Sequence, residues 1–517
     1  MLVNQSKSHL LRASILVIII SLAAKVVGFA RDAVIAAYYG ANWQTDAFFL
    51  AQSMPSIIFP AVCNSLSTAF LSIYVSKSVG DKRDADAYAS NILIFASLLT
   101  VCLSVLAIIL SPVLVPLFAP GFSENQSTLA IHLTRITMGA FVLVMIQYVL
   151  SAILSARKLY YGAQIAALIY NFSVILIMAC QGKGQSMDTL TTTVVVGHLI
   201  QDVSLMLFLK NQFSFRPTPA FLGEETKNLI NLMLPILVGN SVVQINNIVD
   251  KVLSSLFGDG TMSALSYSNT LNRFVTGIVI TTLSTVIYPV LAERYSQEEH
   301  ETFAETIWSS ISISLIVLTP VSIITVTCAQ DIVRFVYERG NFNTDATKLT
   351  AFALTFYGFM YVFSAVQEII TRAFYAMKDT KTPLRTASIA ILANAFLSIM
   401  FSRVLRLGGI ALGTTLSTLF ASILLLFALK KKVANIDFKE IVPTLLKIMV
   451  SATVLLGMVI VLKSTFSGIS AFPRFLLISI ICFSIHIILL AVMKCKEILI
   501  LIKILERRLK RFTHNLR

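Results

Sequence analysis

Charged side chains interrupt several apolar stretches of this sequence. Lys25, Arg31 and Asp32 lie inside the otherwise apolar run 10–38. A charge that faces hydrocarbon costs on the order of 2.5–3.5 kcal/mol on an insertion scale, so we expect these groups to face a protein or water-filled interior. The same reasoning selects the candidate substrate-binding residues Lys25, Arg31, Asp32, Asp46, Asp250, Lys251 and Arg273. A second set, with a structural or ion-coupling role, is Arg135, Glu368, Arg372 and Asn394.

Spacing places some of these groups on common helix faces. Lys25 and Asp32 are seven residues apart and share one face, whereas Arg31 points about a third of a turn away. A second polar stripe contains Gln244, Asn247 and Lys251. The two stripes predict a central polar cavity lined by the first, second, seventh and eighth helices, and its cations would suit an anionic substrate such as a diphosphate or a carboxylate.

Structural interpretations compete with functional ones at several positions. Glu368 and Arg372 are four residues apart and can pair along one helix. His198, Gln201 and Asp202 share a helix face, for which we expect a satisfied interhelical hydrogen-bond cluster. Arg135 could instead snorkel to the membrane boundary. A sodium site that includes Asp250 and Asn394 is an alternative to these structural roles.

Composition and apolar run length predict an all-α polytopic membrane protein. Of 517 residues, 56% are hydrophobic and 13% charged, and the mean hydropathy is +0.81, outside the range of soluble domains. Runs of about twenty apolar residues predict fourteen transmembrane helices. Their ranges are 10–38, 45–75, 88–118, 128–156, 160–180, 189–210, 227–256, 262–292, 304–329, 348–377, 384–402, 408–430, 440–463 and 471–493.

The net charge of +15 reflects membrane topology rather than nucleic-acid binding. Lys and Arg gather on alternate connections, for example at 77–83, 157–158 and 430–432, which predicts that both termini are cytoplasmic. The segment 494–517 has apolar and basic residues at helical spacing, so we expect an amphipathic tail along the anionic inner leaflet.

The sequence also resembles itself with an offset of about 218 residues. Asp32 precedes Gly40 by eight residues, as Asp250 precedes Gly258. PGFSENQST (120–128) matches RGNFNTDAT (339–347), and IAALIYNF (165–172) matches IAILANAF (389–396). Two six-helix pseudo-symmetric lobes are therefore predicted, with a substrate site between them, as in alternating-access transporters. The predicted parts are an N-terminal lobe (1–215), a C-terminal lobe (225–432), two further helices (433–493) and the tail (494–517).

No catalytic or cofactor motif is visible in the sequence. There is no GxxxxGK[ST] loop, no HExxH and no Gly-x-Ser-x-Gly elbow. The six cysteines show no CxxC or metal-like spacing. We therefore expect neither an enzyme nor a bound cofactor or metal.

Four segments together form a specific signature. They are GFARDAVIAAYYG (28–40), TDAFFLAQSMP (45–55), ERGNF (338–342) and RAFYAMKDTKTP (372–383). With the plan of six, six and two helices, this signature resembles the MurJ/MviN family of the multidrug/oligosaccharidyl-lipid/polysaccharide exporter superfamily. The resemblance extends over about residues 10–430 and more loosely beyond.

The resemblance implies a function as well as a fold. Members of the family flip lipid II, the undecaprenyl-diphosphate-linked peptidoglycan precursor, from the inner to the outer leaflet of the bacterial cytoplasmic membrane. It implies a V-shaped, two-lobed fold, alternating access, a cationic central cavity for the headgroup and a lipid-tail groove formed by the last two helices. It also implies dependence on membrane potential or a cation gradient, with lipid II, membrane lipids and cell-wall synthesis enzymes as partners.

Individual residues match or depart from the family pattern. Arg31 matches the arginine of the GFARD motif, Asp32 its neighbour and Asp46 the aspartate of TDAFF. Lys25 stands where members often have arginine, which keeps the charge but loses the bidentate fork. The segment 55–70 lacks the arginine pair and the acidic residue of many members, and in the eighth helix Thr270 replaces an arginine, with Arg273 one turn later as a substitute.

Three alternatives to a lipid II flippase stay open at this point. The first is a flippase of the same fold for another polyprenyl-linked oligosaccharide, such as a capsule or exopolysaccharide unit. The second is a polyprenyl-dependent glycosyltransferase or ligase, which would need a carboxylate site facing water. The third is a cation-coupled drug exporter, whose cavity would be acidic or aromatic rather than rich in Lys and Arg.

Overall fold

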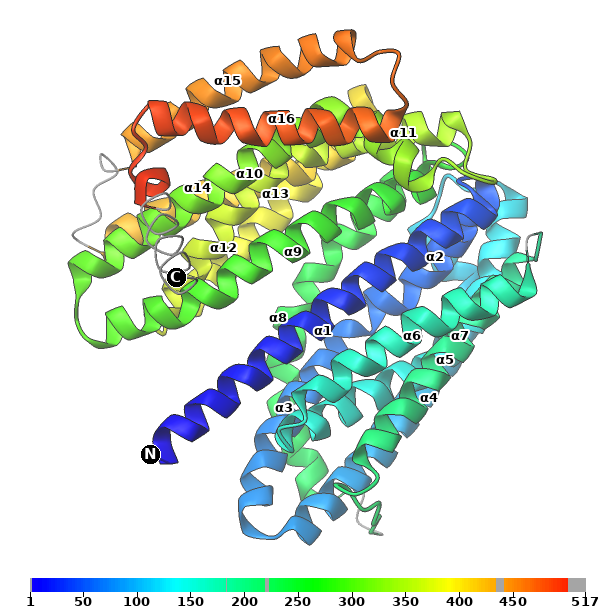
Figure 1. Ribbon diagram of the computed structural model, residues 1–517. Coiled ribbons are helices and arrows are strands. Elements are labelled where there is room, and N and C mark those ends of the chain that lie inside the picture. Colours follow the sequence, from blue (N-terminus) through cyan, green and yellow to red (C-terminus); the bar gives the residue numbers. More distant parts are fainter. Residues whose placement is uncertain (1, 183, 219–222, 434–440, 501–517) are drawn as a thin grey trace, which may run out of the picture. The chain divides into compact units, whose positions relative to one another are not determined.

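The computed structural model describes residues 2–182, 184–218, 223–433 and 441–500, and this part of the chain contains helices and connections but no strand (Figure 1). Residues 501–517, which include most of the predicted amphipathic tail, lie outside the described residues. The first eight helices are α1 (Leu2–Tyr39), α2 (Trp43–Ile58), α3 (Pro60–Gly80), α4 (Lys82–Phe118), α5 (Glu124–Ala156), α6 (Tyr160–Gln181), α7 (Met187–Leu209) and α8 (Glu224–Ser255).

The remaining eight helices complete the chain in the same all-α manner. They are α9 (Thr261–Ser296), α10 (His300–Tyr337), α11 (Thr344–Gly358), α12 (Met360–Ala376), α13 (Lys381–Leu405), α14 (Leu407–Lys432), α15 (Val442–Thr465) and α16 (Ala471–Val492). Contacts divide the chain into unit 1, Met1–Tyr267 with Arg339–Ala346, and unit 2, Ser268–Glu338 with Thr347–Arg517. The lobe boundaries at 215 and 225 rest on the sequence repeat, and they stay a prediction.

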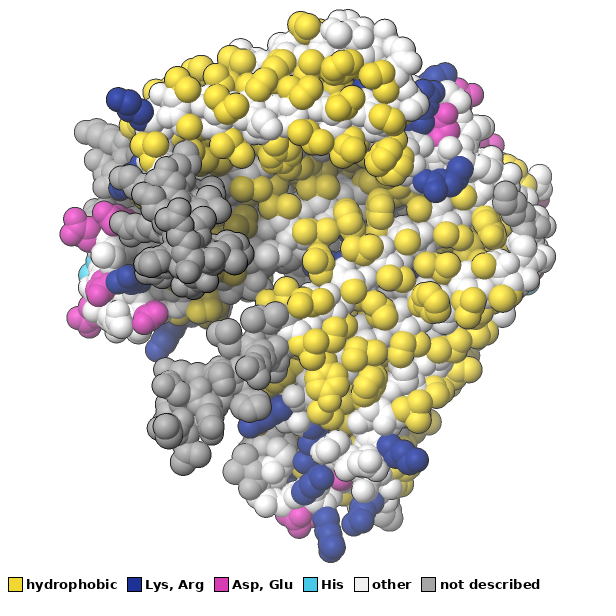
Figure 2. Space-filling model, in the orientation of Figure 1, with side chains coloured by type: hydrophobic (Ala, Val, Ile, Leu, Met, Phe, Trp, Pro, Cys, Tyr) yellow, Lys and Arg dark blue, Asp and Glu magenta, His cyan; other side chains and the backbone are white. Residues whose placement is uncertain are grey.

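Most of the described helices can cross a membrane. Eleven are long and apolar enough, counting Trp43–Ser78 as one, and the bent pair of α11 and α12 would make twelve. The predicted total of fourteen is therefore not confirmed; α1 and α8, which contain intramembrane charges, are not among the twelve. Figure 2 shows apolar side chains over the visible helices of unit 1, with Lys and Arg gathered near helix ends.

Two predicted spans are each broken into two helices. The expected helix 45–75 ends as α2 at Ile58 and restarts as α3 at Pro60. Pro60 has no backbone N–H, and its ring clashes with the carbonyl of the preceding turn, so it interrupts the helix at Phe59. Phe59 at the break still donates its N–H to the Pro55 carbonyl, at 3.1 Å. The expected helix 348–377 is likewise bent by 42° between α11 and α12.

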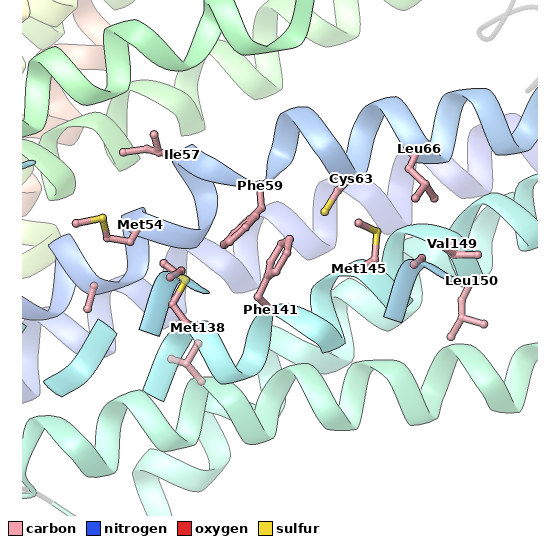
Figure 3. Close-up of a cluster of buried hydrophobic side chains, with 14 of the residues drawn as sticks. Met54, Ile57, Phe59, Cys63, Leu66, Met138, Phe141, Met145, Val149 and Leu150 are labelled. Atoms are coloured by element: carbon pink, nitrogen blue, oxygen red, sulfur yellow. The ribbon is translucent and has the colours of Figure 1, made fainter. Parts of the chain in front are cut away.

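The break between α2 and α3 packs against α5 (Figure 3). The ring of Phe59 stacks on that of Phe141, with ring centroids 3.6 Å apart and an interplanar angle of 20°. Both rings are at most 2% exposed. The surrounding side chains are Met54, Ile57, Cys63, Leu66, Met138, Met145, Val149 and Leu150. Aromatic stacking and apolar burial therefore hold the broken span in place.

The helical pair α15–α16 is joined to α10 by polar contacts as well as apolar packing (Figure 1). The His486 ring on α16 bonds the Ser451 hydroxyl through Nδ1, at 2.8 Å, and the Ile316 carbonyl through Nε2, at 3.0 Å. The Lys463 ammonium donates to the Thr327 carbonyl, at 2.8 Å. These bonds fix the pair within unit 2, and the lipid-tail groove expected there stays a prediction.

The internal repeat has matching backbone features in unit 1. Gly40 and Gly258, paired by the repeat, both have positive φ, +73° and +98°, which glycine adopts without the steric cost of a side chain. The other repeat pair, Gly121 and Gly340, meets helix ends so closely that a Cβ atom would overlap a carbonyl oxygen. Gly121 meets the end of α8 at Ser255, and Gly340 meets the end of α1 at Ala37. Each repeated segment therefore makes an equivalent contact with a helix of the other repeat: Gly121 of the first with α8 of the second, and Gly340 of the second with α1 of the first.

Gly121→Ala tests the close approach of the connection after α4 to the end of α8. The added methyl group overlaps the Ser255 carbonyl, so we expect a loss of about 1–3 kcal/mol in stability, seen as a lower thermal unfolding midpoint of the purified protein. Gly139→Ala in α5 is the matched control because, beyond the neighbouring backbone of its own helix, no heavy atom lies within 4 Å of its Cβ position. It should leave the midpoint unchanged or raise it. Equal midpoints for both variants would contradict the contact.

Candidate functional site

The charges of α1 form a partly buried layer with aromatic side chains from α6 and α7. Nη2 and Nε of Arg31 donate to one carboxylate oxygen of Asp32, at 2.7 and 3.0 Å, and the two side chains are 22% and 19% exposed. The guanidinium lies 5.4 Å from the ring centroid of Tyr170 on α6. The Tyr170 ring stacks on His198 of α7, with 4.5 Å between ring centroids. An ion pair and a cation–π contact thus stabilise Arg31.

Part of this layer could be predicted from sequence and part could not. Spacing placed Arg31 off the face of Asp32, but its long side chain reaches the carboxylate of the next residue. Lys25, on the same helix, is exposed. Tyr170 was not selected, although it lies in the repeated segment 165–172, because an aromatic residue in an apolar helix gives no signal of its own.

Asp46, in the first turn of α2, contacts the start of α9 and is not part of the Arg31 layer. Its carboxylate is 1% exposed and accepts the backbone N–H of Gly260, at 2.6 Å. It also accepts the backbone N–H and the hydroxyl of Ser263, both at 2.7 Å. The N-terminus of a helix presents free N–H groups and a positive dipole end, which favour a carboxylate. In this conformation Asp46 is engaged in capping α9.

The polar stripe of α8 is confirmed as one helix face. Asn247 donates from Nδ2 to Oε1 of Gln244, at 3.0 Å. One turn further along, the Lys251 ammonium donates to the hydroxyl of Ser266 on α9, at 3.2 Å. Asp250 and Lys251 are both half-buried, so α8 places two charges within unit 1.

In unit 2, Glu368 and Arg372 pair along α12, as their spacing indicates. Nη2 of Arg372 lies 2.6 Å from Oε1 of Glu368, and the Ser284 hydroxyl bonds both side chains. A cavity of about 280 Å³ borders Glu368. Its other lining residues, from α9 and α12, are Thr276, Gly277, Ile280, Ser364 and Gln367. Arg273 is exposed on α9, one turn before Thr276. The predicted cavity between the two halves of the repeat stays a prediction.

Arg135 and Asn394 make structural contacts. Nε of Arg135, which is exposed on α5, lies 3.3 Å from the Ser111 hydroxyl of α4. Asn394 is 3% exposed and donates from Nδ2 to Thr414 and Ser417 of α14, at 3.2 Å each. Among the described residues no group of three or more His, Cys, Asp or Glu side chains could hold a metal ion.

Asp379 of the RAFYAMKDTKTP segment holds the start of α13. It accepts the N–H of Lys381 at 3.0 Å and the hydroxyl of Thr382 at 2.6 Å, and it pairs with the Lys432 ammonium at the end of α14. Burial opposes the charge of this carboxylate, yet the hydrogen bonds from Lys432 and Thr382 outweigh it and hold the pKa of Asp379 well below its usual value. This signature residue therefore has a structural role between helices.

The cluster expected on α7 is not a satisfied one. Asp202 is 2% exposed, and within the described part of the chain neither of its carboxylate oxygens has a hydrogen-bond partner. Nδ1 of His198 is also without one among these residues. The expectation of an interhelical hydrogen-bond cluster is wrong for these two groups because the neighbouring faces of the helices packed on α7 do not present donors to them. The sequence showed that His198 and Asp202 share a face of α7, but it did not show which side chains of other helices would contact that face.

Comparison with solved structures defines the class of protein. A multidrug resistance MATE family transporter of the MOP superfamily, in an inward-facing conformation, matches with a TM-score of 0.67 at 14% identity, over 81% of this chain and 98% of that one. The structure described as lipid II flippase MurJ, inward closed conformation, matches with a TM-score of 0.78 at 24% identity, over 91% and 98%. The chain therefore has the fold of the polytopic transporters of this superfamily.

Sequence comparison narrows the class to one family. The model of the family described as lipid II flippase MurJ matches residues 35–482. The probable lipid II flippase MurJ of Rickettsia prowazekii (strain Madrid E) is 25% identical over 413 residues, which cover 79% of this chain and 81% of that protein. The chain belongs to the MurJ family, which confirms the resemblance found in the sequence.

Asp46→Ala tests the role of Asp46 at the start of α9. It leaves the N–H groups of Gly260 and Ser263 without their buried acceptor, and we expect the free energy of unfolding to fall by about 2–4 kcal/mol. The measurement is denaturant or thermal unfolding in detergent. Asp259→Ala, at an exposed aspartate one residue before Gly260, is the control and should cause a much smaller loss. A stable Asp46→Ala protein with impaired transport would instead make Asp46 a substrate contact.

Asp202→Asn tests the unpartnered carboxylate of α7. A buried carboxylate without a hydrogen bond opposes folding, and the neutral amide of the same shape reduces that penalty. We expect the thermal unfolding midpoint to rise, by the equivalent of about 1 kcal/mol or more. Asp188→Asn, at an exposed position near the start of the same helix, should leave it unchanged. A lower midpoint for Asp202→Asn would show that the carboxylate has a partner in solution.

Proposed function

We propose that this protein flips lipid II from the inner to the outer leaflet of the bacterial cytoplasmic membrane. The observation that carries the proposal is the match of the family described as lipid II flippase MurJ to residues 35–482, most of the chain. The partly buried cations of α1 and α8 support it, because lipid II presents a diphosphate, which guanidinium and ammonium groups bind by charge-assisted hydrogen bonds.

Arg31 is the residue we assign to the diphosphate. Its partly buried guanidinium is held by Asp32 and by the Tyr170 ring, so an incoming anion meets a cation that is already oriented. In our proposal the diphosphate replaces Asp32 as the anionic partner during transport, and Asp32 holds the guanidinium when the site is empty. Lys25, Asp250, Lys251 and Arg273 belong to the same proposed path.

The proposed reaction moves the substrate without breaking a bond. Transport of this kind needs two alternating conformations and an energy source rather than catalytic groups. We propose that membrane potential or a cation gradient supplies the energy and that no cofactor takes part. Both termini would lie in the cytoplasm, where the basic connections face the anionic leaflet. Cell-wall synthesis enzymes would use the flipped product.

Depletion of the protein in the cell tests the proposed substrate. We expect lipid II to accumulate in the inner leaflet and the cells to lyse. Expression of the wild-type protein should prevent both the accumulation and the lysis. Viable cells that lack only a surface polysaccharide would overturn the proposal in favour of a flippase for another polyprenyl-linked oligosaccharide.

Complementation of the depleted cells with Arg31→Ala tests the assigned contact. Loss of a charge-assisted contact of about 1.5–3 kcal/mol predicts a rate of lipid II translocation lower by roughly 10- to 100-fold. Arg83→Ala, at an exposed arginine in the first turn of α4, is the matched control and should retain the wild-type rate. Unchanged translocation with Arg31→Ala at equal protein level would remove Arg31 from the proposed path.

A further inference from the structure

An apolar groove lies on unit 1 where α4, α5 and α7 meet the segment that follows α7. Its volume is about 470 Å³. Its walls include Leu98 of α4, Leu150 of α5 and Met206 of α7, with Phe213 and Phe215 from the segment after α7. At the end of α7 a single charged side chain, Lys210, completes the lining. The groove thus combines a long apolar wall with one cation.

The wall that follows α7 is held by a network of side chains on α4. Asp86 accepts the backbone N–H of Ser214 at 3.1 Å, Ser90 accepts that of Arg216 at 2.8 Å, and Asn91 accepts that of Thr218 at 2.8 Å. Every second N–H points to α4, which is the pattern of an extended chain. Alternate residues therefore share a face, and Phe213 and Phe215 both line the groove.

The anchor of this wall is itself buried. Asp86 forms an ion pair with Arg157, at 2.7 Å, and the two side chains are 5% and 13% exposed. Tyr74 donates its hydroxyl to the same carboxylate at 3.3 Å and accepts from Nε of Arg157 at 3.1 Å. A charge network of this kind keeps the segment after α7 in one position, so the groove is a built feature of unit 1.

The end of the groove at Lys210 is positively charged. Lys210 is exposed and forms no ion pair with the described residues, whereas Arg157 and Lys77 are paired with Asp86 and Glu225. Figure 2 shows Lys and Arg side chains gathered at the end of unit 1 where α3 ends and α4 begins. The exposed cations at these helix ends are Lys82, Arg83, Lys158, Lys210 and Arg216. Of the nearby acids, Asp81 is the N-cap residue of α4 and Asp84 lies in its first turn. Basic side chains beside transmembrane helices attract anionic headgroups.

We propose that this groove binds a phospholipid with an anionic headgroup, one acyl chain lying along the apolar wall and the phosphate at the Lys210 ammonium. A zwitterionic headgroup also has a phosphate, but its own cation offsets that charge and it complements the Lys210 ammonium less well than an anionic headgroup. A diphosphate is bound best by several converging cations or arginine forks, whereas Lys210 is the one cation among the described residues that line the groove. The groove is made by helices of unit 1, whereas α15 and α16 belong to unit 2, so the groove goes beyond the proposed flipping of lipid II.

Binding of defined lipids to the purified full-length protein tests the proposal. Delipidated protein is titrated with phosphatidylglycerol or with phosphatidylcholine of the same acyl chains, and bound lipid is counted by native mass spectrometry. We expect one phosphatidylglycerol to bind at least tenfold more tightly than phosphatidylcholine. Ser97→Trp, which fills the groove from α4, should weaken phosphatidylglycerol binding at least tenfold. Lys210→Glu should abolish the preference for the anionic lipid.

Matched variants separate the groove from general effects. Cys102→Trp adds the same side chain at an exposed position of α4 that does not line the groove, and Lys431→Glu makes the same charge change at the end of α14. Both should bind phosphatidylglycerol as the wild type does. Lys210→Glu alters only an exposed side chain, so it keeps the test decisive if Ser97→Trp fails to fold.

Three outcomes would overturn the proposal. The first is equal binding of phosphatidylglycerol and phosphatidylcholine to the wild type. The second is unchanged phosphatidylglycerol binding to a folded Ser97→Trp protein together with a retained preference in Lys210→Glu. The third is tighter binding of undecaprenyl diphosphate than of phosphatidylglycerol, lost in Ser97→Trp, which would assign the groove to the tail of a polyprenyl substrate.

Discussion

The carboxylate of Asp46 at the N-terminus of α9 is the interaction on which the arrangement of unit 1 depends. It joins the first turn of α2 to the first turn of α9 across more than two hundred residues of sequence. Tyr267, two turns into α9, donates its hydroxyl to the Gly40 carbonyl at 3.1 Å, so the end of α1 is fixed to the same helix. Because a buried charge without partners is so unfavourable, the burial of Asp46 depends on the start of α9 being in place beside α2.

Charges inside apolar helices are tolerated here because most of them meet a partner. Asp32 and the Tyr170 ring flank Arg31, and the Ser266 hydroxyl accepts from Lys251. Each partner reduces the desolvation cost of a cation while leaving it oriented for an anion, which is what transport of a diphosphate-linked lipid requires. Asp202 has no such partner among the described residues, and its burial opposes folding.

The duplication in the sequence gains its physical meaning from contacts made crosswise. The repeat pairs Gly121 with Gly340, and each lies against the end of a helix that the repeat also pairs, α8 for the first and α1 for the second. The matches could be found in the sequence because glycine is needed where two backbones approach closely. The sequence could not show which helix end each glycine would contact, since that helix end lies far away along the chain.

The sequence by itself determined the all-helical membrane class, the approximate place of most helices, the repeat and the family, because apolar run length, residue spacing and short motifs are local properties. It also indicated that Glu368 and Arg372 pair, since both lie on one helix. It did not reveal the breaks at Phe59 and Phe359. Only the tertiary structure decided that Asp46 caps α9, that Tyr170 contacts Arg31 and that Asp202 has no donor among the described residues. Each of these depends on which side chains other helices bring to a residue, and contacts between distant helices are not encoded in local spacing.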